Sequence, residues 1–334
     1  MKVAINGFGR IGKNFFHAVM ADATALKTIQ IVAINIGADL VEHMPLTIKY
    51  DTLLGRYTGA VERKGNTITV NGHAIEIITA LDPLTIDWRA RGIDWVVDCT
   101  GRFTQRADAQ KHLQAGAKKV LISAPAHDED VSIVPGVNSE QYDAQKHAIV
   151  SLGSCTTNAL MPMLKVLHEQ FGISNGVMTT VHAYTNSQHL LDGDGKDPRK
   201  ARAAALNIIP TSTGASRMVG KIIPELDGKI IAQSIRVPVG VVSYLTLAVV
   251  CKKTISPEVI NGAFEQASKT SLKNILAITQ EPLVSSDFAR TNQSVTIDAL
   301  STAVVESTAT VAGWYDNEWA YSVRMKEFLL SITH

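Results

Sequence analysis

Cys155 stands in the stretch SLGSCTTNALMP at residues 151–162, where a strand-like run gives way to a helical pattern. A thiol at a helix N-terminus faces backbone N–H groups and the positive end of the helix dipole, which stabilise the thiolate. The position therefore predicts a nucleophile, although filling a turn is the commoner role of a free cysteine. Pro162 implies that the helix either begins late or bends, because proline fits without a kink only in the first turn.

A base for this thiol is expected at His182, in the stretch MTTVHAYTN. It follows a β-branched strand and precedes polar residues, so its side chain can emerge at a strand end. A histidine beside a cysteine can form an ion pair that activates the sulfur. A lone histidine in this place is more often structural, so the pattern leaves the pairing open. The ten histidines and three cysteines show no CxxC or HExxH spacing, so we expect no metal site.

A second motif with chemical meaning is INGFGRIG, which places Gly7, Gly9 and Gly12 as GxGxxG between a strand and a helix. This context gives a tight turn, close backbone approach to a pyrophosphate and a helix N-terminus facing its charge. The sequence therefore predicts a bound dinucleotide, and the alternative is a turn without a ligand.

The adenosine ribose of such a dinucleotide is usually held by a carboxylate at the end of the second strand. Here Asn35 and Ile36 occupy that corner, and Asp39 is close but in an open register. No arginine or lysine adjoins it to hold a 2′-phosphate. NAD is expected, with NADP also possible.

The elements that must position these residues fall into two parts. The first 150 residues alternate short β-branched runs (KVAIN, IQIVAIN, IDWVVDCTG, KKVLISAP, HAIVSLG) with helical patterns, which predicts an α/β fold with an N-terminal Rossmann doubly wound parallel sheet. After Cys155 the strands lengthen and alternate, which predicts an α+β catalytic domain with a mixed or antiparallel sheet covered by helices on one face. We expect a dinucleotide-binding domain at 1–152, completed by a C-terminal helix at 317–334, and a catalytic domain at 153–316.

Composition narrows the class of protein. The chain has 334 residues, 46% of them hydrophobic, with a formal net charge of +1. This charge gives no field that attracts nucleic acid or an anionic membrane, so neither is an expected partner. The cysteines are sparse and odd in number, which predicts a reducing compartment, and the lack of a signal-like start predicts a cytoplasmic protein. Residues 186–204 are polar and rich in glycine and charge, which predicts a long ordered loop or an interface segment.

At the level of whole motifs the sequence resembles the phosphorylating glyceraldehyde-3-phosphate dehydrogenase family. The similarity extends from INGFGRIG through DCTG, SCTTN, TTVHAYTN, PTSTGA and IRVPVGVVS to WYDNEWAYS. It implies oxidation of glyceraldehyde 3-phosphate with inorganic phosphate to 1,3-bisphosphoglycerate, in glycolysis or gluconeogenesis, by a homotetramer. Cys155 would attack the aldehyde and pass through a thioester, with His182 acting as base and acid.

The same resemblance implies which residues bind ligands. Lys200 stands where a second arginine is expected near the phosphate site, which keeps the charge but loses bidentate geometry. The implied phosphate-binding residues are Ser154, Thr156, Thr185, Lys200, Thr213, Gly214 and Arg236. The implied cofactor-binding residues are Gly7, Phe8, Gly9, Arg10, Ile11, Gly12, Asn35, Thr100, Gly101, Ser123, Asn317 and Tyr321.

Several positions depart from the family pattern. Ile36 replaces the usual acidic ribose ligand, and Leu81 aligns with an arginine that often flanks the adenine. Gly193 and Asp194 stand where members that use NAD commonly have Leu and Pro. Ala159 replaces a second cysteine, so no local disulfide can protect Cys155.

Two other functions stay open. An erythrose 4-phosphate dehydrogenase would share this fold and cysteine, although the intact PTSTGA motif favours an enzyme that uses inorganic phosphate. A non-enzymatic dinucleotide-binding redox sensor would instead oxidise Cys155 and would need a resolving cysteine nearby.

Overall fold

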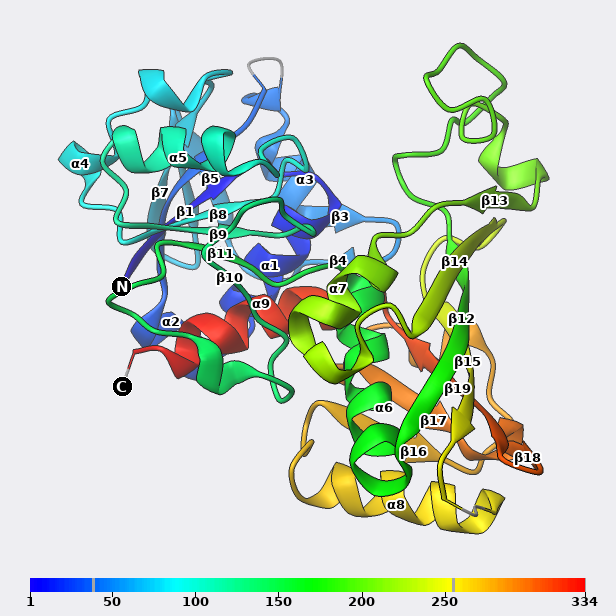
Figure 1. Cartoon of the computed structure of the whole chain (residues 1–334). Coiled ribbons are helices and arrows are strands. Elements are labelled where there is room, and N and C mark those ends of the chain that lie inside the picture. Colours follow the sequence, from blue (N-terminus) through cyan, green and yellow to red (C-terminus); the bar gives the residue numbers. More distant parts are fainter. Residues whose placement is uncertain (38–39, 254–255, 334) are drawn as a thin grey trace. The chain divides into compact units, whose positions relative to one another are not determined.

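The computed structural model describes residues 1–37, 40–253 and 256–333. Asp39, which we considered for the ribose corner, lies outside these ranges. The chain folds into two compact units (Figure 1). Unit 1 comprises Met1–Ile133, Glu140–Gly153 and the segment from Ser322 onward, and unit 2 comprises Val134–Ser139 and Ser154–Tyr321.

Unit 1 is built on one sheet with the strand order β10-β11-β9-β8-β1-β2-β7-β6-β5. The strands from β10 to β7 run parallel, and β6 and β5 extend the sheet in antiparallel pairing. Each of the five runs expected as buried parallel strands forms one, because β-branched residues suit a surface covered on both sides. The bounds are β1 Lys2–Asn6, β2 Gln30–Asn35, β5 Val61–Lys64, β6 Thr67–Val70, β7 His73–Ile78, β8 Trp95–Asp98, β9 Lys119–Ile122, β10 Val131–Ser132 and β11 Ile149–Ser151.

The helices of unit 1 cover this sheet. The first begins directly after the glycine turn and buries Phe15, Phe16 and Val19 on its inner side, at the spacing that the sequence predicted. The bounds are α1 Arg10–Met20, α2 Ala23–Thr28, α3 Met44–Lys49, α4 Trp88–Arg91 and α5 Arg106–Gln114, with a short hairpin of β3 Tyr50–Asp51 and β4 Gly55–Arg56. Helix α9, Trp319–Ser331, brings Phe328 against Trp95 at a ring-centroid distance of 5.9 Å.

A buried polar chain joins the carboxyl ends of three parallel strands in unit 1. The Asn6 side-chain amide donates to Asp98 at 2.7 Å, and the Asn35 amide donates to Asn6 at 2.7 Å. Asp98 also accepts from the Thr100 hydroxyl at 2.7 Å. These bonds fix β8, β1 and β2 in one register and hold the loop after β8.

Unit 2 contains a mixed sheet with the order β13-β14-β12-β15-β19-β17-β16, with β18 paired to β19. The sequence predicted such a sheet, and burial alternates along β15 as one covered face requires. Helices α6, α7 and α8 lie against one face of it (Figure 1). The bounds are β12 Ile173–Ala183, β13 Ile209–Thr211, β14 Ile230–Val237, β15 Ser243–Cys251, β16 Leu276–Thr279, β17 Val295–Asp298, β18 Ala303–Val305, β19 Thr308–Tyr315, α6 Cys155–Phe171, α7 Ala215–Ile222 and α8 Pro257–Lys269.

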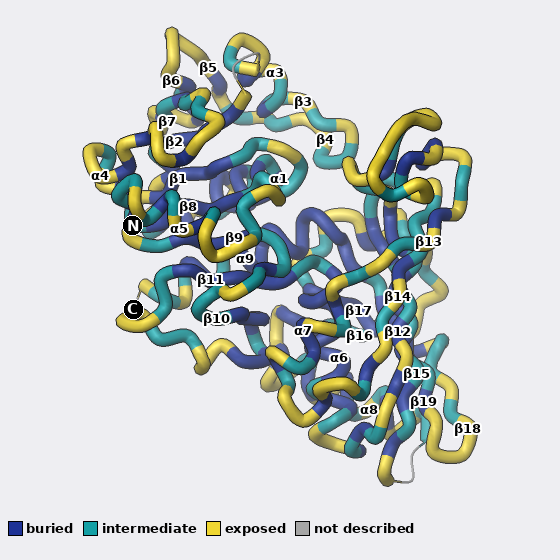
Figure 2. Tube along the Cα trace, turned by 45° about the horizontal axis from the view of Figure 1, so that its top comes forward, coloured by how far each residue is buried: buried dark blue, intermediate teal, exposed yellow. Residues whose placement is uncertain are grey.

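Between β12 and β13, residues 186–203 form turns without a helix or a regular strand, as the sequence predicted for a long loop. An isolated bridge joins His189 and Ala203. Figure 2 shows this loop as largely exposed, and Leu190 and Leu191 are 81% and 71% exposed. Two large apolar side chains in water mark a surface that a partner could cover.

Candidate active site and dinucleotide pocket

Cys155 is the first residue of α6, and Ser154 caps that helix by accepting a hydrogen bond from the Thr157 N–H at 3.1 Å. The helix does not begin late, because Pro162 lies in its interior. The serine cap satisfies one of the free N–H groups of the first turn and sets where the helix starts. This places the thiol at the helix N-terminus, as expected from the sequence.

His182 lies on β12, one residue before that strand ends, and its Nε2 atom is 3.5 Å from the Cys155 Sγ atom. Only 3% of the histidine is exposed, whereas the cysteine keeps an intermediate exposure. The structure therefore brings together the two side chains whose pairing the sequence pattern left open. A thiol and an imidazole at this distance can exchange a proton.

The second ring nitrogen of His182 lies beside a carbonyl and a cation. Nδ1 is 2.6 Å from the Ala183 oxygen, and the Arg236 guanidinium lies 2.7 Å from Nδ1 and donates to the same oxygen at 3.1 Å. A guanidinium can only donate, so Nδ1 accepts from Arg236 when the ring proton is on Nε2, and the Ala183 carbonyl accepts from Nδ1 when the proton is there. We assign the second tautomer to the reactive state, with Arg236 bonded to the Ala183 oxygen. The Nε2 lone pair then faces the sulfur, as a general base requires.

Burial and Arg236 set the charges of this pair. Desolvation, followed by the charge of Arg236, lowers the pKa of His182 to about 3, so its imidazole is neutral at pH 7. Desolvation raises the pKa of the Cys155 thiol against the lowering effects of Arg236 and of hydrogen bonds with Thr156. Both shifts disfavour a resting ion pair in the protein without ligands, and the pairing of Cys155 as nucleophile with His182 as base stays a prediction.

Tyr315 is a residue of this site that the sequence reasoning missed. Its hydroxyl is 3.0 Å from the Thr156 hydroxyl on α6 and 2.7 Å from that of Thr180 on β12. Its ring packs edge-on against His182, with centroids 5.9 Å apart. The tyrosine thus ties the helix of the nucleophile to the strand of the base. Nothing in the sequence distinguishes it from any other aromatic residue at a strand end.

The dinucleotide motif of unit 1 opens onto a pocket of about 390 Å³ at the ends of β1, β2 and β8. Of the predicted cofactor residues, Gly7, Phe8, Gly9, Asn35 and Thr100 line it. A Cβ atom on Gly12 would approach the Gly7 oxygen to 2.2 Å, whereas one on Gly9 would meet nothing within 4 Å. Gly12 therefore permits the tight turn, and Gly9 leaves space over the helix N-terminus where a pyrophosphate fits.

Other predicted cofactor residues have different surroundings. The guanidinium of Arg10 pairs with Asp51, which Lys13 also contacts at 2.9 Å. Desolvation raises the pKa of Asp51, but hydrogen bonds from Leu54, Arg10 and Lys13 outweigh it and hold this pKa far below its usual range. The residues that line the pocket do not include Ile11, Gly101 or Ser123. Two further predicted residues, Asn317 and Tyr321, are buried in unit 2.

The corner at which we expect the ribose is apolar. Ile36 and Leu81 line the pocket, and no carboxylate does so within the described ranges. The Asn35 amide donates to Asn6 at 2.7 Å and to the Ala80 oxygen at 2.8 Å, and it accepts from the Ala80 N–H at 2.9 Å. With its hydrogen bonds used inside the protein, Asn35 shapes the pocket.

In the part of the chain that the structure describes, a cation does line this pocket, although none adjoins Ile36 along the sequence. Arg102 follows β8 in the stretch TGRF and stands with Phe103 in the pocket wall. The sequence reasoning missed it because it considered cations next to Ile36 along the chain. The parallel sheet brings the loop after β8 to the same edge as the end of β2.

Comparison with known proteins decides the family. The protein-family model for the NAD binding domain of glyceraldehyde 3-phosphate dehydrogenase matches residues 1–106. The family model for the C-terminal domain of the same enzyme matches residues 154–317. The chain belongs to the glyceraldehyde-3-phosphate dehydrogenase family. This confirms the predicted family, its α/β fold class and NAD as cofactor.

Curated relatives cover almost the whole chain. The glyceraldehyde-3-phosphate dehydrogenase of Geobacillus stearothermophilus is 49% identical over 328 residues, which are 97% of this chain and 96% of the relative. Glyceraldehyde-3-phosphate dehydrogenase 1 of Bacillus cereus is 48% identical over 335 residues, covering 99% and 98%.

Within this family member, the predicted phosphate residues fall into two groups. Ser154, Thr156 and Arg236 surround the cysteine and the histidine. The Nε atom of Arg236 is buried without a hydrogen-bond partner among the described residues, so it can donate to an anion. The other predicted phosphate residues make local contacts. The Thr185 hydroxyl is hydrogen-bonded to that of Ser187 at 2.8 Å, and Lys200 forms an ion pair with Asp197 at 3.5 Å. Thr213, next to Gly214 at the start of α7, accepts a hydrogen bond from the Ala215 N–H at 3.3 Å.

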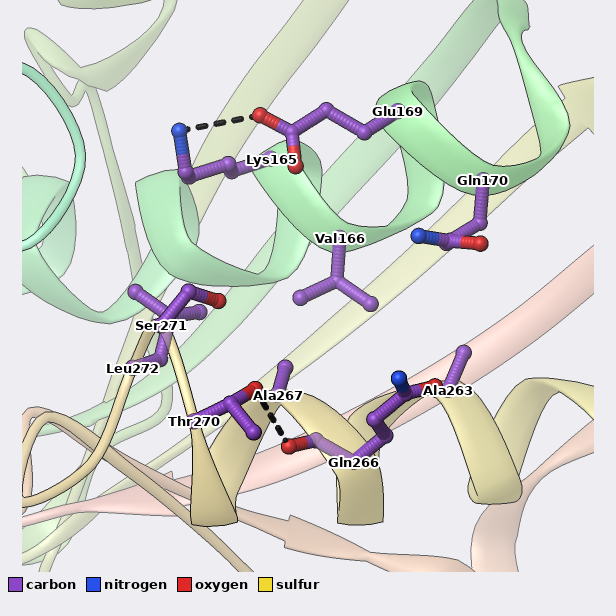
Figure 3. A pocket seen from close by; sticks show the side chains of 10 residues that line it. All are labelled: Lys165, Val166, Glu169, Gln170, Ala263, Gln266, Ala267, Thr270, Ser271 and Leu272. Carbon is purple, nitrogen blue, oxygen red and sulfur yellow. Dashed lines mark hydrogen bonds and ion pairs between the residues drawn. The ribbon is translucent and has the colours of Figure 1, made fainter.

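A separate pocket of about 230 Å³ lies between α6 and α8, lined by Lys165, Glu169, Gln170, Gln266 and six neighbours (Figure 3). Lys165 is paired with Glu169 at 2.9 Å, and none of the predicted site residues reaches this pocket. Over the ranges that the structure describes, no cluster of His, Cys, Asp and Glu could hold a metal ion, and no helix is long and apolar enough to cross a membrane.

Proposed function

We propose that Cys155 is the nucleophile and His182 the base of an NAD-dependent phosphorylating glyceraldehyde-3-phosphate dehydrogenase. The observation that supports this assignment is the 3.5 Å distance between Sγ and Nε2 at the N-terminus of α6. The lone pair of a neutral imidazole faces the sulfur, so the thiol can lose its proton as it reacts.

In this mechanism the Cys155 sulfur adds to the aldehyde carbon of glyceraldehyde 3-phosphate, and the thiol proton passes to His182. NAD, when bound, supplies the acceptor for the hydride that leaves this carbon. His182 returns this proton to the former carbonyl oxygen, which gives a thiohemiacetal, and accepts the hydroxyl proton again as the hydride leaves, which gives a thioester on Cys155. Inorganic phosphate then attacks the thioester carbon, which releases 1,3-bisphosphoglycerate and the free sulfur.

The charges of unit 2 suit this chemistry. Arg236 stabilises negative charge on sulfur and on the oxygen that develops from the aldehyde. We assign the two phosphate groups to hydroxyl, amide and cationic groups of unit 2, with Arg236 and Thr185 on one side. The further residues assigned to phosphate are Ser154, Thr156, Lys200, Thr213 and Gly214.

NAD is assigned to the pocket of unit 1. The helix N-terminus after Gly9 receives the pyrophosphate, and Phe8, Thr100 and Phe103 form the walls. In unit 2, Asn317 and Tyr321 are assigned to the nicotinamide by the family pattern. The remaining cofactor assignments are Gly7, Arg10, Ile11, Gly12, Asn35, Gly101 and Ser123.

We further propose that the protein acts as a homotetramer in the cytoplasm. Exposed apolar side chains on unit 2 support an assembly: Leu190, Leu191, Leu206 and Ile208 around the loop, and Ile231 on the open face of the sheet. All three cysteines are free, which suits a reducing compartment.

The test is steady-state kinetics with glyceraldehyde 3-phosphate and NAD, with and without phosphate. We expect phosphate-dependent NADH formation that falls on the order of 10³-fold or more in Cys155→Ser, because an alcohol ionises far less readily than a thiol. Cys251→Ala, at a buried cysteine on β15, is the matched control and keeps activity. Acyl-enzyme formation by Cys155→Ser would refute the assignment. A preference for erythrose 4-phosphate would support the alternative substrate.

A further inference from the structure

Val242 adopts a backbone conformation that its side chain disfavours. Its φ angle is +69°, in the left-handed region, and only 2% of the residue is exposed. A β-branched residue there is a true outlier, which persists only where the surrounding structure imposes it. Val242 immediately precedes β15, so this conformation sets how the first residue of that strand, Ser243, is presented.

The Ser243 hydroxyl lies between two other parts of unit 2. It accepts a hydrogen bond from the Ala183 N–H at 3.1 Å and donates to the Asn317 side-chain oxygen at 3.2 Å. The serine is 1% exposed and Asn317 is 3% exposed, so water does not compete for these bonds. A single hydroxyl therefore joins the ends of β12 and β15 to the segment after β19.

The first of these bonds acts on the base. Ala183 follows His182, and its carbonyl oxygen contacts both the imidazole Nδ1 at 2.6 Å and the Arg236 guanidinium at 3.1 Å. The bond from the Ala183 N–H restrains the peptide group between His182 and Ala183, and the next peptide group, which contains this carbonyl, is held by the Tyr184 N–H donating to the Val239 oxygen at 3.1 Å. The orientation of the His182 ring, and with it the Nε2 to Sγ distance, depends on these anchors.

The second bond orients an amide. Because the Asn317 oxygen accepts from Ser243, the amide NH₂ group is its donor end for a ligand. This part of the inference rests on the proposed function, in which Asn317 contacts the nicotinamide. An unanchored amide could present either its oxygen or its nitrogen.

We propose that Ser243, held by the left-handed Val242, is a positioning residue that fixes the proton-accepting geometry of His182 and the amide orientation of Asn317 together. It touches neither the reacting sulfur nor the phosphate residues. Its loss therefore affects proton transfer and use of NAD, while binding of the aldehyde substrate stays near normal.

The experiment compares the whole enzyme carrying Ser243→Ala with Ser294→Ala, a matched control. Ser294 is 3% exposed, and its hydroxyl has no hydrogen-bond partner among the described residues. For Ser243→Ala we expect kcat to fall about 10-fold to 100-fold and KM for NAD to rise several-fold. KM for glyceraldehyde 3-phosphate should change less than about 2-fold, since the substrate contacts are intact. Ser243→Thr, which keeps a hydroxyl, should restore most of kcat.

A second readout needs no catalysis. The rate of Cys155 alkylation by iodoacetamide, followed against pH in protein without NAD, should change its profile in Ser243→Ala and not in Ser294→Ala. If Ser243→Ala does not fold, Ser243→Cys keeps the size with weaker hydrogen bonding and should show the same kinetic pattern. Wild-type kcat, KM for NAD and alkylation profile in a folded Ser243 variant without the hydroxyl would overturn the proposal. An inactive wild type would instead refute the proposed function, and the alkylation comparison would still test Ser243.

Discussion

At the scale of single residues, Arg236 acts on both reactive side chains at once. Its charge lowers the pKa of His182 and also lowers that of the Cys155 thiol, although burial raises the latter overall. A positive charge favours a thiolate and disfavours an imidazolium, so one guanidinium keeps the base neutral and eases ionisation of the nucleophile.

Arg236→Leu should therefore raise the pKa values of both Cys155 and His182. At pH 7 to 8 the thiolate fraction falls, so alkylation of Cys155 by iodoacetamide slows, and its inflection moves to higher pH. Histidine ¹H–¹³C NMR should show the His182 titration moving upward from about 3. Arg202→Leu, at an exposed arginine paired with Asp192, is the control and should change neither titration. Faster alkylation in Arg236→Leu would contradict this account.

Ile36 gives a second prediction at this scale. With an apolar corner and Arg102 in the same pocket wall, we expect NAD use with weakened discrimination against NADP. Ile36→Asp should reduce turnover with NADP by more than it changes turnover with NAD, by an effect on the order of 1 to 3 kcal/mol. The measurement is kcat/KM for both cofactors in both proteins. If the wild type already rejects NADP and the variant behaves identically, Ile36 does not lie at the ribose.

At the scale of elements, the turn between β1 and α1 contains two glycines with different roles: we expect Gly12 to be needed for stability and Gly9 for binding NAD. A methyl group on Gly12 would collide with the Gly7 oxygen, whereas Gly9 faces open space. Gly12→Ala should destabilise the protein by a few kcal/mol, roughly the cost of strained packing. Gly9→Ala should unfold at the wild-type urea concentration but bind NAD more weakly, because its methyl group enters the space left for the pyrophosphate. Urea titration and NAD fluorescence measure the two effects, and equal stability of both variants would disprove the distinction.

How much the sequence could predict depended on how local each signal was. The strands β1, β2, β8, β9 and β11 and helix α1 follow from runs of neighbouring residues. The parallel pairing of β12 with β14 joins segments about fifty residues apart, and no local pattern encodes it. Cys155, His182 and the glycines stood out because their chemistry is unusual. Tyr315 and Ser243 did not, since a hydroxyl gains its role only from the groups that the fold places beside it.

At the scale of the whole molecule, exposed apolar surface on unit 2 predicts assembly. Leu190 and Leu191 lie in the loop 186–203 and are largely exposed. Replacing both with Ser should weaken a tetramer, because it removes apolar area from the contact. Light scattering at several protein concentrations measures this, and Leu300→Ser, at another exposed leucine, is the control. A fully active wild-type monomer would rule out the proposed assembly.

The way in which the two units are divided along the sequence determines when each can complete its packing during synthesis. Unit 1 begins at Met1 but also needs the segment from Ser322 onward, where Phe328 packs against Trp95 and Lys326 contacts Asp22 at 2.6 Å. Unit 2 is contiguous apart from residues 134–139, so on a ribosome all of its residues emerge before unit 1 has received its last helix. Until that helix emerges, the Rossmann sheet lacks the contact of Phe328 with Trp95, so the packing of unit 1 is completed only after all residues of unit 2 are available.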